Sequence, residues 1–306
     1  MAHETAEGVA LRAGRSRLEF LPAAGGSITR YCWEADGGDV DWLRPNVGLQ
    51  GPRPDPLAMA CFPLVPFSGR IREGRFAFQG QQVALPLNFP PERHAIHGQG
   101  WQAPWTLISR SETEATIEYR HEADAWPWDY RARQTFALRD EDLVLEIEVT
   151  NTSPRAMPAG IGFHPYFLRT PEARITAGVA AMWQCDAEVM PVRLLTPPPE
   201  ERALDTGVVA ETVAMDNTFA GWNRQAEIVW PEWRASLTMT ADPPLRFLVV
   251  FTPPGEEFFC VEPVSNRTDA FNLPAGGESE AVGGTRILAP GESLAAKAQL
   301  SPRLDR

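Results

Sequence analysis

The sequence has almost no lysine, since Lys297 is the only one among its 28 basic residues. Lys297 lies in a polar, alanine-rich segment near the C-terminus, so we set aside pyridoxal and lysine-dependent aldolase chemistry, which need a lysine placed to form a Schiff base. The 40 acidic residues leave a net charge of −12. This balance argues against nucleic acid and anionic membranes as partners.

Disulfides, export signals and membrane spans are also lacking. The four cysteines form no CxxC pair and read as reduced thiols of a cytoplasmic protein. The N-terminus has no basic region followed by an apolar run, so we expect no signal peptide. No stretch approaches the roughly 20 consecutive apolar residues of a membrane-spanning helix. We expect a cytoplasmic monomer or homodimer that does not bind membranes.

Long helices are not expected either, because 29 prolines are spread along the chain and favour short strands joined by turns. The clearest strand covers residues 143–150, where Leu143, Leu145 and Ile147 share one face and Glu146 and Glu148 the other. Such alternation is typical of a sheet with a buried and a solvated side. Residues 170–215 read as mostly loop. The sequence predicts an all-β chain, which we take as a single domain over residues 1–306.

Residues 159–168, with the sequence AGIGFHPYFL, predict a strand because apolar and aromatic residues follow one another without a helical period. Alternate side chains share a face, so Gly160, Gly162, His164 and Tyr166 lie together. Glycine inside a strand often marks the close approach of a ligand or another backbone. We expect the two glycines to leave room for a ligand beside His164 and Tyr166. The alternative is a core histidine with a satisfied hydrogen bond.

A carboxylate stands near the end of another apolar strand, in which Phe258, Cys260 and Glu262 share a face. Burial at such a place raises the pKa of a carboxyl group toward neutral, which suits a general base. The alternative is an ion pair between Glu262 and Arg267. The chain has no nucleophile-elbow pattern and no glycine-rich phosphate loop.

Two other segments carry residues suited to binding a polyol. Arg70 follows a sharp Ser-Gly turn and presents a fork of donors to hydroxyls or carboxylates; the alternative is a structural salt bridge. Asp216 and Trp222 could present a carboxylate and an indole to a sugar, which carboxylates and aromatic rings hold well; the alternative is a plain turn.

A histidine pair could suggest a metal site. His94 and His97 are three residues apart, which on an extended strand puts them on opposite faces. No nearby cysteine, aspartate or third histidine completes a ligand set. We therefore predict neither a metal ion nor a cofactor, and read the two histidines as loop packing unless other evidence gives them a role.

The order and spacing of these motifs resemble the aldose 1-epimerase (galactose mutarotase) family over nearly the whole chain. The fold implied by the resemblance is a large antiparallel β-sandwich, the galactose mutarotase-like supersandwich, with very little helix. The segments that carry the resemblance are FSGRI at 67–71, HG at 97–98, FHPYF at 163–167, DNTF at 216–219 and VE at 261–262.

The resemblance also implies an activity and residue roles. Glu262 matches the general base that takes the proton of the anomeric hydroxyl, and His164 matches the general acid that protonates the ring oxygen. His97 matches a second active-site histidine near that oxygen, while Arg70 and Asp216 match ligands of sugar hydroxyls. The sugar ring opens, the C1–C2 bond rotates, and reclosure gives the other anomer, without a cofactor.

The chain departs from the galactose-acting pattern beside the acid histidine. Those members usually carry Asn before it and Ser after it, where this chain has Phe163 and Pro165. Three alternatives stay open. One is a non-catalytic sugar-binding or regulatory protein on the same fold. Another is a hexose-6-phosphate epimerase, if Arg72 or Arg93 faces the pocket. The third is a glycoside hydrolase or lyase using Asp216 and Glu262.

Overall fold

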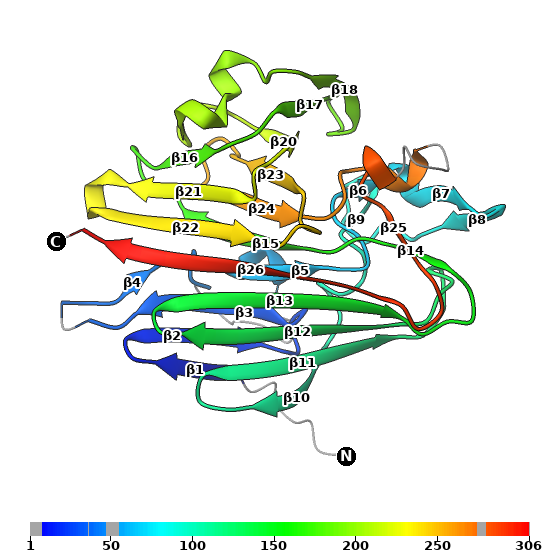
Figure 1. The fold of residues 1–306 in the computed structure, drawn as a ribbon, viewed down its shortest axis with the longest axis horizontal. Helices are drawn as coiled ribbons and strands as arrows, with labels where there is room; N and C mark the ends of the chain where they lie inside the picture. Colours follow the sequence, from blue (N-terminus) through cyan, green and yellow to red (C-terminus); the bar gives the residue numbers. More distant parts are fainter. Residues whose placement is uncertain (1–7, 36, 47–54, 274–279, 306) are drawn as a thin grey trace.

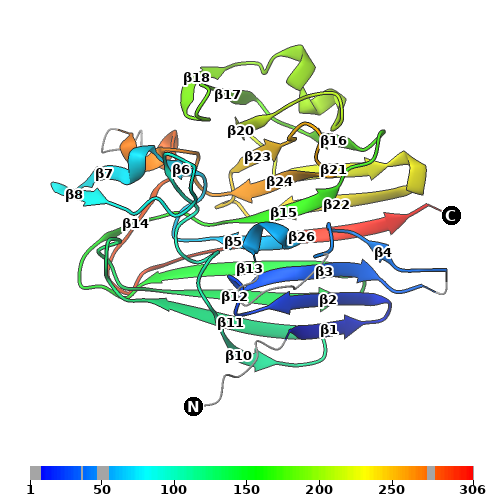
Figure 2. The ribbon, with the colours of Figure 1, turned by 180° about the vertical axis from the view of Figure 1, so that it is seen from behind.

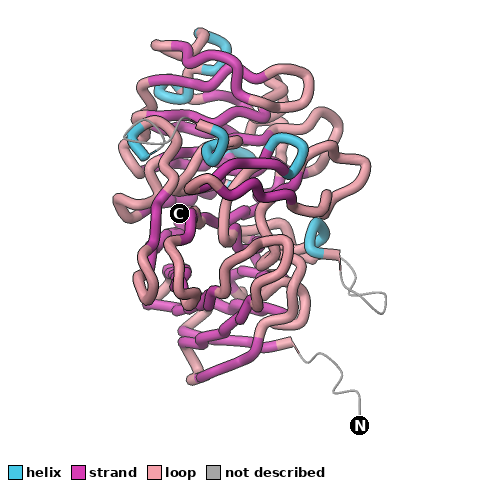
Figure 3. Tube along the Cα trace, turned by 90° about the vertical axis from the view of Figure 1, so that its right-hand side faces the viewer, coloured by secondary structure: helices cyan, strands magenta, loops and turns pink. Residues whose placement is uncertain are grey.

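The structure is a computed structural model that describes residues 8–35, 37–46, 55–273 and 280–305. Strands β1 to β26 make up about half of the described residues, and the helical turns lie at the periphery (Figure 3). Among the described residues, none of the helices has the length and apolar character that a membrane span needs. The short 3-10 turns are η1 (Pro56–Ala58), η2 (Arg72–Gly74), η3 (Glu200–Arg202), η4 (Leu204–Thr206), η5 (Pro231–Trp233) and η6 (Ala270–Asn272).

Two large antiparallel sheets lie face to face, and Figure 1 shows the smaller one in front. The larger sheet has 11 strands, one of which, β4 (Val40–Asp41), pairs beside β3. Its other strands, in order across the sheet, are β1 (Val9–Ala13), β2 (Ser16–Leu21), β3 (Ser27–Trp33), β5 (Cys61–Leu64), β15 (Gly162–Leu168), β24 (Phe258–Val264), β23 (Phe247–Phe251), β20 (Asp216–Ala220), β17 (Ala181–Cys185) and β18 (Pro191–Leu195).

The smaller sheet has nine strands and includes the longest strand of the described chain, β26. Its strands alternate between apolar residues toward the larger sheet and polar residues toward solvent, as β13 illustrates. In order they are β10 (Thr106–Arg110), β11 (Glu114–His121), β12 (Tyr130–Arg139), β13 (Asp142–Asn151), β26 (Ser293–Leu304), β22 (Ala235–Ala241), β21 (Gln225–Trp230), β16 (Arg174–Ala177) and β19 (Val208–Val209).

Three two-stranded ribbons lie at one side of the sandwich, where Figure 2 shows them near β15 and β24. The ribbons are β6 (Arg70–Ile71) with β9 (Ala95–Ile96), β7 (Arg75–Phe78) with β8 (Gln81–Ala84), and β14 (Met157–Ala159) with β25 (Arg286–Leu288).

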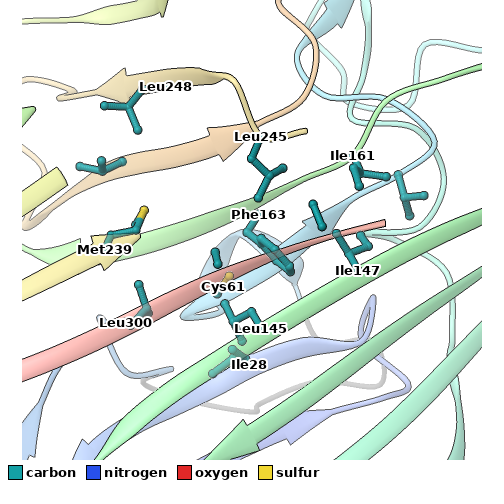
Figure 4. Close-up of a cluster of buried hydrophobic side chains, with 14 of the residues drawn as sticks. Ile28, Cys61, Leu145, Ile147, Ile161, Phe163, Met239, Leu245, Leu248 and Leu300 are labelled. Carbon is teal, nitrogen blue, oxygen red and sulfur yellow. The ribbon is translucent and has the colours of Figure 1, made fainter. Parts of the chain in front are cut away.

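The main core fills the space between the two large sheets. Figure 4 shows Ile161, Phe163 and Leu248 of the larger sheet and its approach segments facing Leu145 and Leu300 of the smaller one. A second apolar cluster lies on the opposite face of the larger sheet and includes Phe62, Tyr166 and Cys260. Both faces of β15 and β24 are therefore covered, and those strands are buried almost throughout.

The all-β expectation is confirmed, and residues 170–215 are mostly loop as expected, although four short strands interrupt the loops. Strands β16, β17, β18 and β19 all fall in that range. The side chains of β18 are exposed or only half-buried, so this edge strand lacks the apolar alternation by which strands are recognised. It is held by backbone pairing to β17.

Candidate active site

A pocket of about 340 Å³ lies over the face of the larger sheet that points away from the main core. This volume is within the range of small-molecule sites, roughly 300–1,000 Å³. Five adjacent strands supply its floor, with Phe62 from β5, His164 and Tyr166 from β15, Glu262 from β24, Val249 and Phe251 from β23, and Asp216 and Thr218 from β20. Strand β6 supplies Arg70 to the walls, and loops supply the other wall residues, including Arg44, Phe89, His97, Val189, Glu256 and Thr268.

His164 and Glu262 meet on this floor. Nε2 of His164 lies 3.3 Å from Oε1 of Glu262, and the two residues are 7% and 3% exposed. Strands β15 and β24 pair side by side, which brings together two residues nearly 100 positions apart in the chain. The alternative partner of Glu262 is excluded, because Arg267 donates to the Thr268 carbonyl and stacks on Trp183.

The imidazole of His164 is held between two aromatic rings. The Phe62 ring stacks on it with centroids 4.4 Å apart, and the Tyr166 ring stacks on it at 4.7 Å. Phe62 is the cross-strand partner of His164, and Tyr166 follows two residues later on the same strand. The rings limit rotation of the imidazole and exclude water from its faces, so Nε2 stays directed at Glu262.

Burial shifts the acid and the base in opposite directions. It lowers the pKa of His164 to about 3, and the positive charges of Arg44 and Arg70 add to this effect. Burial raises the pKa of Glu262 well above its usual value; Asp216 adds to this and Arg70 opposes it. Taken alone, each group is more stable in its uncharged form because the buried pocket solvates charge poorly. Both shifts favour the uncharged pair, in which the one shared proton lies on Glu262 rather than on His164.

His97 reaches the same place from the loop after β9. Its Nδ1 accepts a hydrogen bond from the Gly69 backbone N–H at 3.1 Å, which leaves Nε2 as the protonated nitrogen of the neutral ring. Burial, with nearby His164 and Arg70, lowers the pKa of His97 well below its usual value. Its ring meets that of His164 edge to face, with centroids 5.5 Å apart. His97 is thus a neutral hydrogen-bond donor beside the acid/base pair.

Arg70 forms the polar end of the pocket together with two carboxylates. Its guanidinium lies 3.3 Å from Glu92 and 3.6 Å from Asp216. Burial raises the pKa of Asp216, and Arg70 counteracts the shift. Arg70 therefore forms salt bridges and also lines the pocket. The group offers fixed donors and acceptors, which is what sugar hydroxyls need.

Trp222 does not belong to this site. It is 3% exposed within the main core, and its indole N–H donates to the Gln225 carbonyl. The expectation that its ring faces a polyol is therefore wrong. Trp222 follows the end of β20, and the chain turns there at Gly221 toward β21, so the alternation that places Asp216 in the pocket does not continue to it.

The glycines of the His164 segment also act differently from what we expected. A Cβ on Gly160 would lie 1.9 Å from the Asn266 side chain, and one on Gly162 would lie 2.8 Å from Val264. The space beside them is therefore filled by the chain at the end of β24. They permit close packing of β15 on β24 and leave no room for a ligand.

Phe163 and Pro165, the two departures from the galactose-acting pattern, do not line the pocket. Phe163 is 1% exposed and packs between the sheets, as Figure 4 shows. Phe163 pairs with Pro63 of β5, and Pro165 pairs with Cys61 of the same strand. Their side chains face away from the pocket because strand neighbours alternate, so they can affect the pocket only through the position of His164.

One cluster in the pocket has ligand atoms close enough for a metal ion. His164, Cys260 and Glu262 each offer one atom, all within 4.8 Å of one another. Burial raises the pKa of Cys260 well above its usual value, so it is a neutral thiol and a poor ligand. The other two groups are already bonded to each other, and we assign no metal. His94, the other predicted loop histidine, accepts from the Glu73 N–H outside the pocket.

Several lining residues escaped the sequence analysis. Phe62 lies in the buried strand β5, but its place opposite His164 depends on the pairing of β5 with β15, which no local pattern indicates. Arg44 lies in a proline-bounded loop and carries no local signal of a pocket. Val189 lines the wall with a φ of 61°, a conformation that a β-branched residue rarely adopts.

Comparison with known proteins identifies relatives of this arrangement. A family model described as aldose 1-epimerase matches residues 9–301. The uncharacterized protein YphB of Escherichia coli K12 is 33% identical over 248 residues, which is 79% of this chain and 83% of that protein. Another uncharacterized E. coli protein, YihR, is 30% identical over 117 residues, 38% of each chain.

Solved structures show the same architecture. A candidate aldose 1-epimerase from E. coli K12 superposes with a TM-score of 0.88 at 29% identity, covering 98% of this chain and 99% of that one. A galactose mutarotase-like protein from Clostridium acetobutylicum superposes with a TM-score of 0.87 at 18% identity, covering 100% and 97%. The second comparison bears on the fold alone.

Proposed function

We propose that this chain, which belongs to the aldose 1-epimerase family, is an isomerase that interconverts the α and β anomers of a free sugar without a cofactor. The observation that carries the proposal is the contact of a buried histidine with a buried glutamate, 3.3 Å apart on the pocket floor. An anomeric hydroxyl and a ring oxygen are bonded to the same carbon, so adjacent acid and base groups can reach both at once.

The proposed reaction keeps one proton in the pair throughout. The proton of the pair first passes from Glu262 to His164 across their 3.3 Å contact. Glu262, now a carboxylate, takes the proton of the anomeric hydroxyl while His164, now an imidazolium, protonates the ring oxygen. The bond between C1 and the ring oxygen breaks, and the open-chain carbonyl forms. Glu262 is then neutral and protonated, His164 is neutral, and the C1–C2 bond rotates. Transfer of both protons in reverse recloses the ring on the other face of C1.

The other groups of the pocket hold the sugar during this exchange. His97 donates from Nε2 toward the ring oxygen or a hydroxyl beside it. Arg70 and Asp216 bind hydroxyls on the side of C2, and Tyr166 forms the wall behind His164. Acid and base catalysis of this kind contributes on the order of 10²–10⁴-fold per group.

Polarimetry tests the proposal directly. Freshly dissolved α-D-glucose, α-D-galactose and other aldoses should approach equilibrium faster with the enzyme than in buffer alone. The proposal fails if no sugar equilibrates faster than the buffer blank. Sugar binding by calorimetry without turnover would instead indicate a non-catalytic sugar-binding protein.

Glycoside hydrolysis by Asp216 and Glu262 fits this geometry less well than anomer exchange does. It needs an acid and a base or nucleophile about 5–10 Å apart across a glycosidic bond, but Asp216 is engaged by Arg70 and Glu262 by His164. Release of reducing sugar from an aryl glycoside would favour it over an isomerase. The predicted cytoplasmic location and the oligomeric state stay predictions.

A further inference from the structure

The hairpin of β17 and β18 reaches the pocket with its tip, residues 186–190. Figure 1 shows the hairpin at the upper margin of the molecule, where β18 is the edge strand of the larger sheet. Strand β17 pairs with β20 through Ala181 and Met182, which lie at the end of the strand away from the tip. The tip therefore lies beyond the backbone pairing that joins the hairpin to the rest of the sheet.

The tip separates the pocket from a second hollow, a surface groove of about 280 Å³. Val189 lines the pocket, whereas Ala187 and Glu188 line the groove together with residues of the loop 89–94. Phe89 lines both spaces. The groove leaves the tip room to move, and movement toward it would withdraw Val189 from the pocket wall.

The backbone of Val189 is strained in this position. Its φ of 61° lies in the left-handed region, which a β-branched residue rarely adopts. Asp186 fixes the turn, because its carbonyl accepts from the Val189 N–H and its carboxylate accepts from the N–H groups of Glu188 and Met190. Strained residues gather at ligand clamps and switch segments, where their surroundings hold them in place. Release of the tip would relieve this strain, which favours opening.

Glu188 fastens the tip to the loop on the other side of the groove. Its carboxylate lies 3.1 Å from Nη1 of Arg93 and 3.5 Å from Nε2 of the buried His94. Nδ1 of His94 accepts from the Glu73 N–H, so the neutral ring presents its Nε2–H to Glu188. Neither Arg93 nor Arg72 lines the pocket, so neither is placed to bind a phosphorylated sugar there.

These contacts are weak enough to break and re-form. The side chains of Arg93 and Glu188 are 79% and 42% exposed, and exposed ion pairs contribute little to stability. The contact of Glu188 with His94 is long for a hydrogen bond. The Glu188 contacts favour the closed tip and the strain at Val189 favours the open one, and both energies are small. Such a balance is what a loop that opens and closes over a site needs.

We propose that residues 186–190 form a gate of the pocket, which Glu188 holds closed through Arg93 and His94 and which opens toward the groove to admit and release the sugar. The inference rests on the proposed anomerase function for the identity of the ligand, whereas opening of the gate is measured without turnover. Glu188 and Arg93 act as positioning residues, since they set the place of Val189 in the pocket wall.

Cys185 allows the opening of the gate to be measured. It lines the pocket at the base of the tip and is half-buried, whereas Cys32, Cys61 and Cys260 are buried. Burial raises the pKa of Cys185 to about 11, so alkylation by iodoacetamide is slow and should be faster when the tip opens. Mass spectrometry of the peptide that contains Cys185 gives the rate.

Two substitutions of opposite charge separate opening from electrostatics. Glu188→Gln and Arg93→Gln should each raise the rate of Cys185 alkylation about threefold, the effect of losing one exposed ion pair. A purely electrostatic effect on the thiol differs in sign, because loss of a negative charge favours the thiolate and loss of a positive charge disfavours it. Glu146→Gln is the matched control, since it breaks an ion pair with Lys297 on the smaller sheet, and it should leave the rate unchanged.

The same two variants test whether the gate controls the sugar. For a sugar that the wild type turns over, Glu188→Gln and Arg93→Gln should raise KM more than they change kcat. The open tip retains the sugar less well, while His164 and Glu262 stay in place. Anomer exchange measured by NMR at several sugar concentrations gives both constants.

The possible outcomes distinguish the gate from the proposed function. If either variant is alkylated at the wild-type rate, or if the two change the rate in opposite directions, the gate is overturned and polarimetry alone decides the anomerase function. Faster alkylation with an unchanged KM also overturns it, because the tip then moves without controlling the sugar. If both variants are alkylated faster but the wild type turns over no sugar, the gate is supported and the anomerase function fails.

Discussion

Phe163 and His164 are neighbours in the chain, but their side chains lie on opposite faces of the 11-stranded sheet. Phe163 packs in the main core, while His164 lines the pocket. The same alternation operates on β24, where Val261 enters the core and Glu262 the pocket. Two central strands thus connect the packed interior directly to His164 and Glu262 on the pocket floor.

Removing either member of the pair should abolish most of the activity. We expect Glu262→Gln and His164→Ala each to lower kcat by at least about 100-fold, because each loses one proton transfer in the rate-limiting step. NMR exchange at saturating sugar measures the effect. Glu227→Gln, an exposed carboxyl on β21, is the matched control and should behave like the wild type. Near-normal rates in both pair variants would remove these role assignments.

The activity should not fall near pH 6.5, where protonation of an ordinary histidine would lower it. Because burial lowers the pKa of His164 to about 3, a second proton does not enter the pair near pH 6.5. We expect kcat/KM, after subtraction of the buffer rate, to change less than about threefold from pH 7.5 down to pH 5. Activity should instead fall at alkaline pH, where the pair loses its one proton. An acid limb centred near pH 6.5 would contradict this account.

Glu262→Gln should make the fold more stable at alkaline pH. Burial raises the pKa of Glu262 in the folded state, so its favourable contribution is complete below the unfolded pKa and is lost as pH rises toward the folded value. Glutamine has the same shape without that loss. The melting temperature of Glu262→Gln should therefore exceed the wild-type value at pH 8, with a smaller difference at pH 4. Differential scanning fluorimetry at both pH values measures this, and a variant that is less stable at pH 8 would refute it.

Phe163→Ala should destabilise the chain through its core. Phe163 is 1% exposed, and truncation of such a residue costs about 3–5 kcal/mol of unfolding free energy. Urea denaturation measures the change. The control is Val192→Ala, whose side chain on β18 is 65% exposed and whose loss should cost no more than about 0.5 kcal/mol. A Phe163 variant as stable as the control would contradict the assigned packing.

Much of the candidate site could be predicted from the chain because strand alternation is a local property. The alternation within residues 159–168 predicted that His164 and Tyr166 share one face of a strand. The apolar run at residues 258–263 predicted that the Glu262 carboxyl is desolvated. The same reasoning failed for Trp222, which follows a turn after β20 and enters the core. It also misjudged Gly160 and Gly162, because a missing side chain says nothing about which neighbour occupies the space.

The amino-acid sequence by itself determined the all-β class, through its dispersed prolines and alternating segments. It also determined which acidic and basic side chains are available for acid/base catalysis. Only the tertiary structure decided which strands became neighbours. The pairing of β15 with β24 brings His164 to Glu262, and the return of β5 places Phe62 on the imidazole. The connection after β4 places Arg44 over the ring of Tyr166 in the pocket wall. The pairing of strands distant in sequence depends on closure of the whole sheet, and no local pattern encodes it.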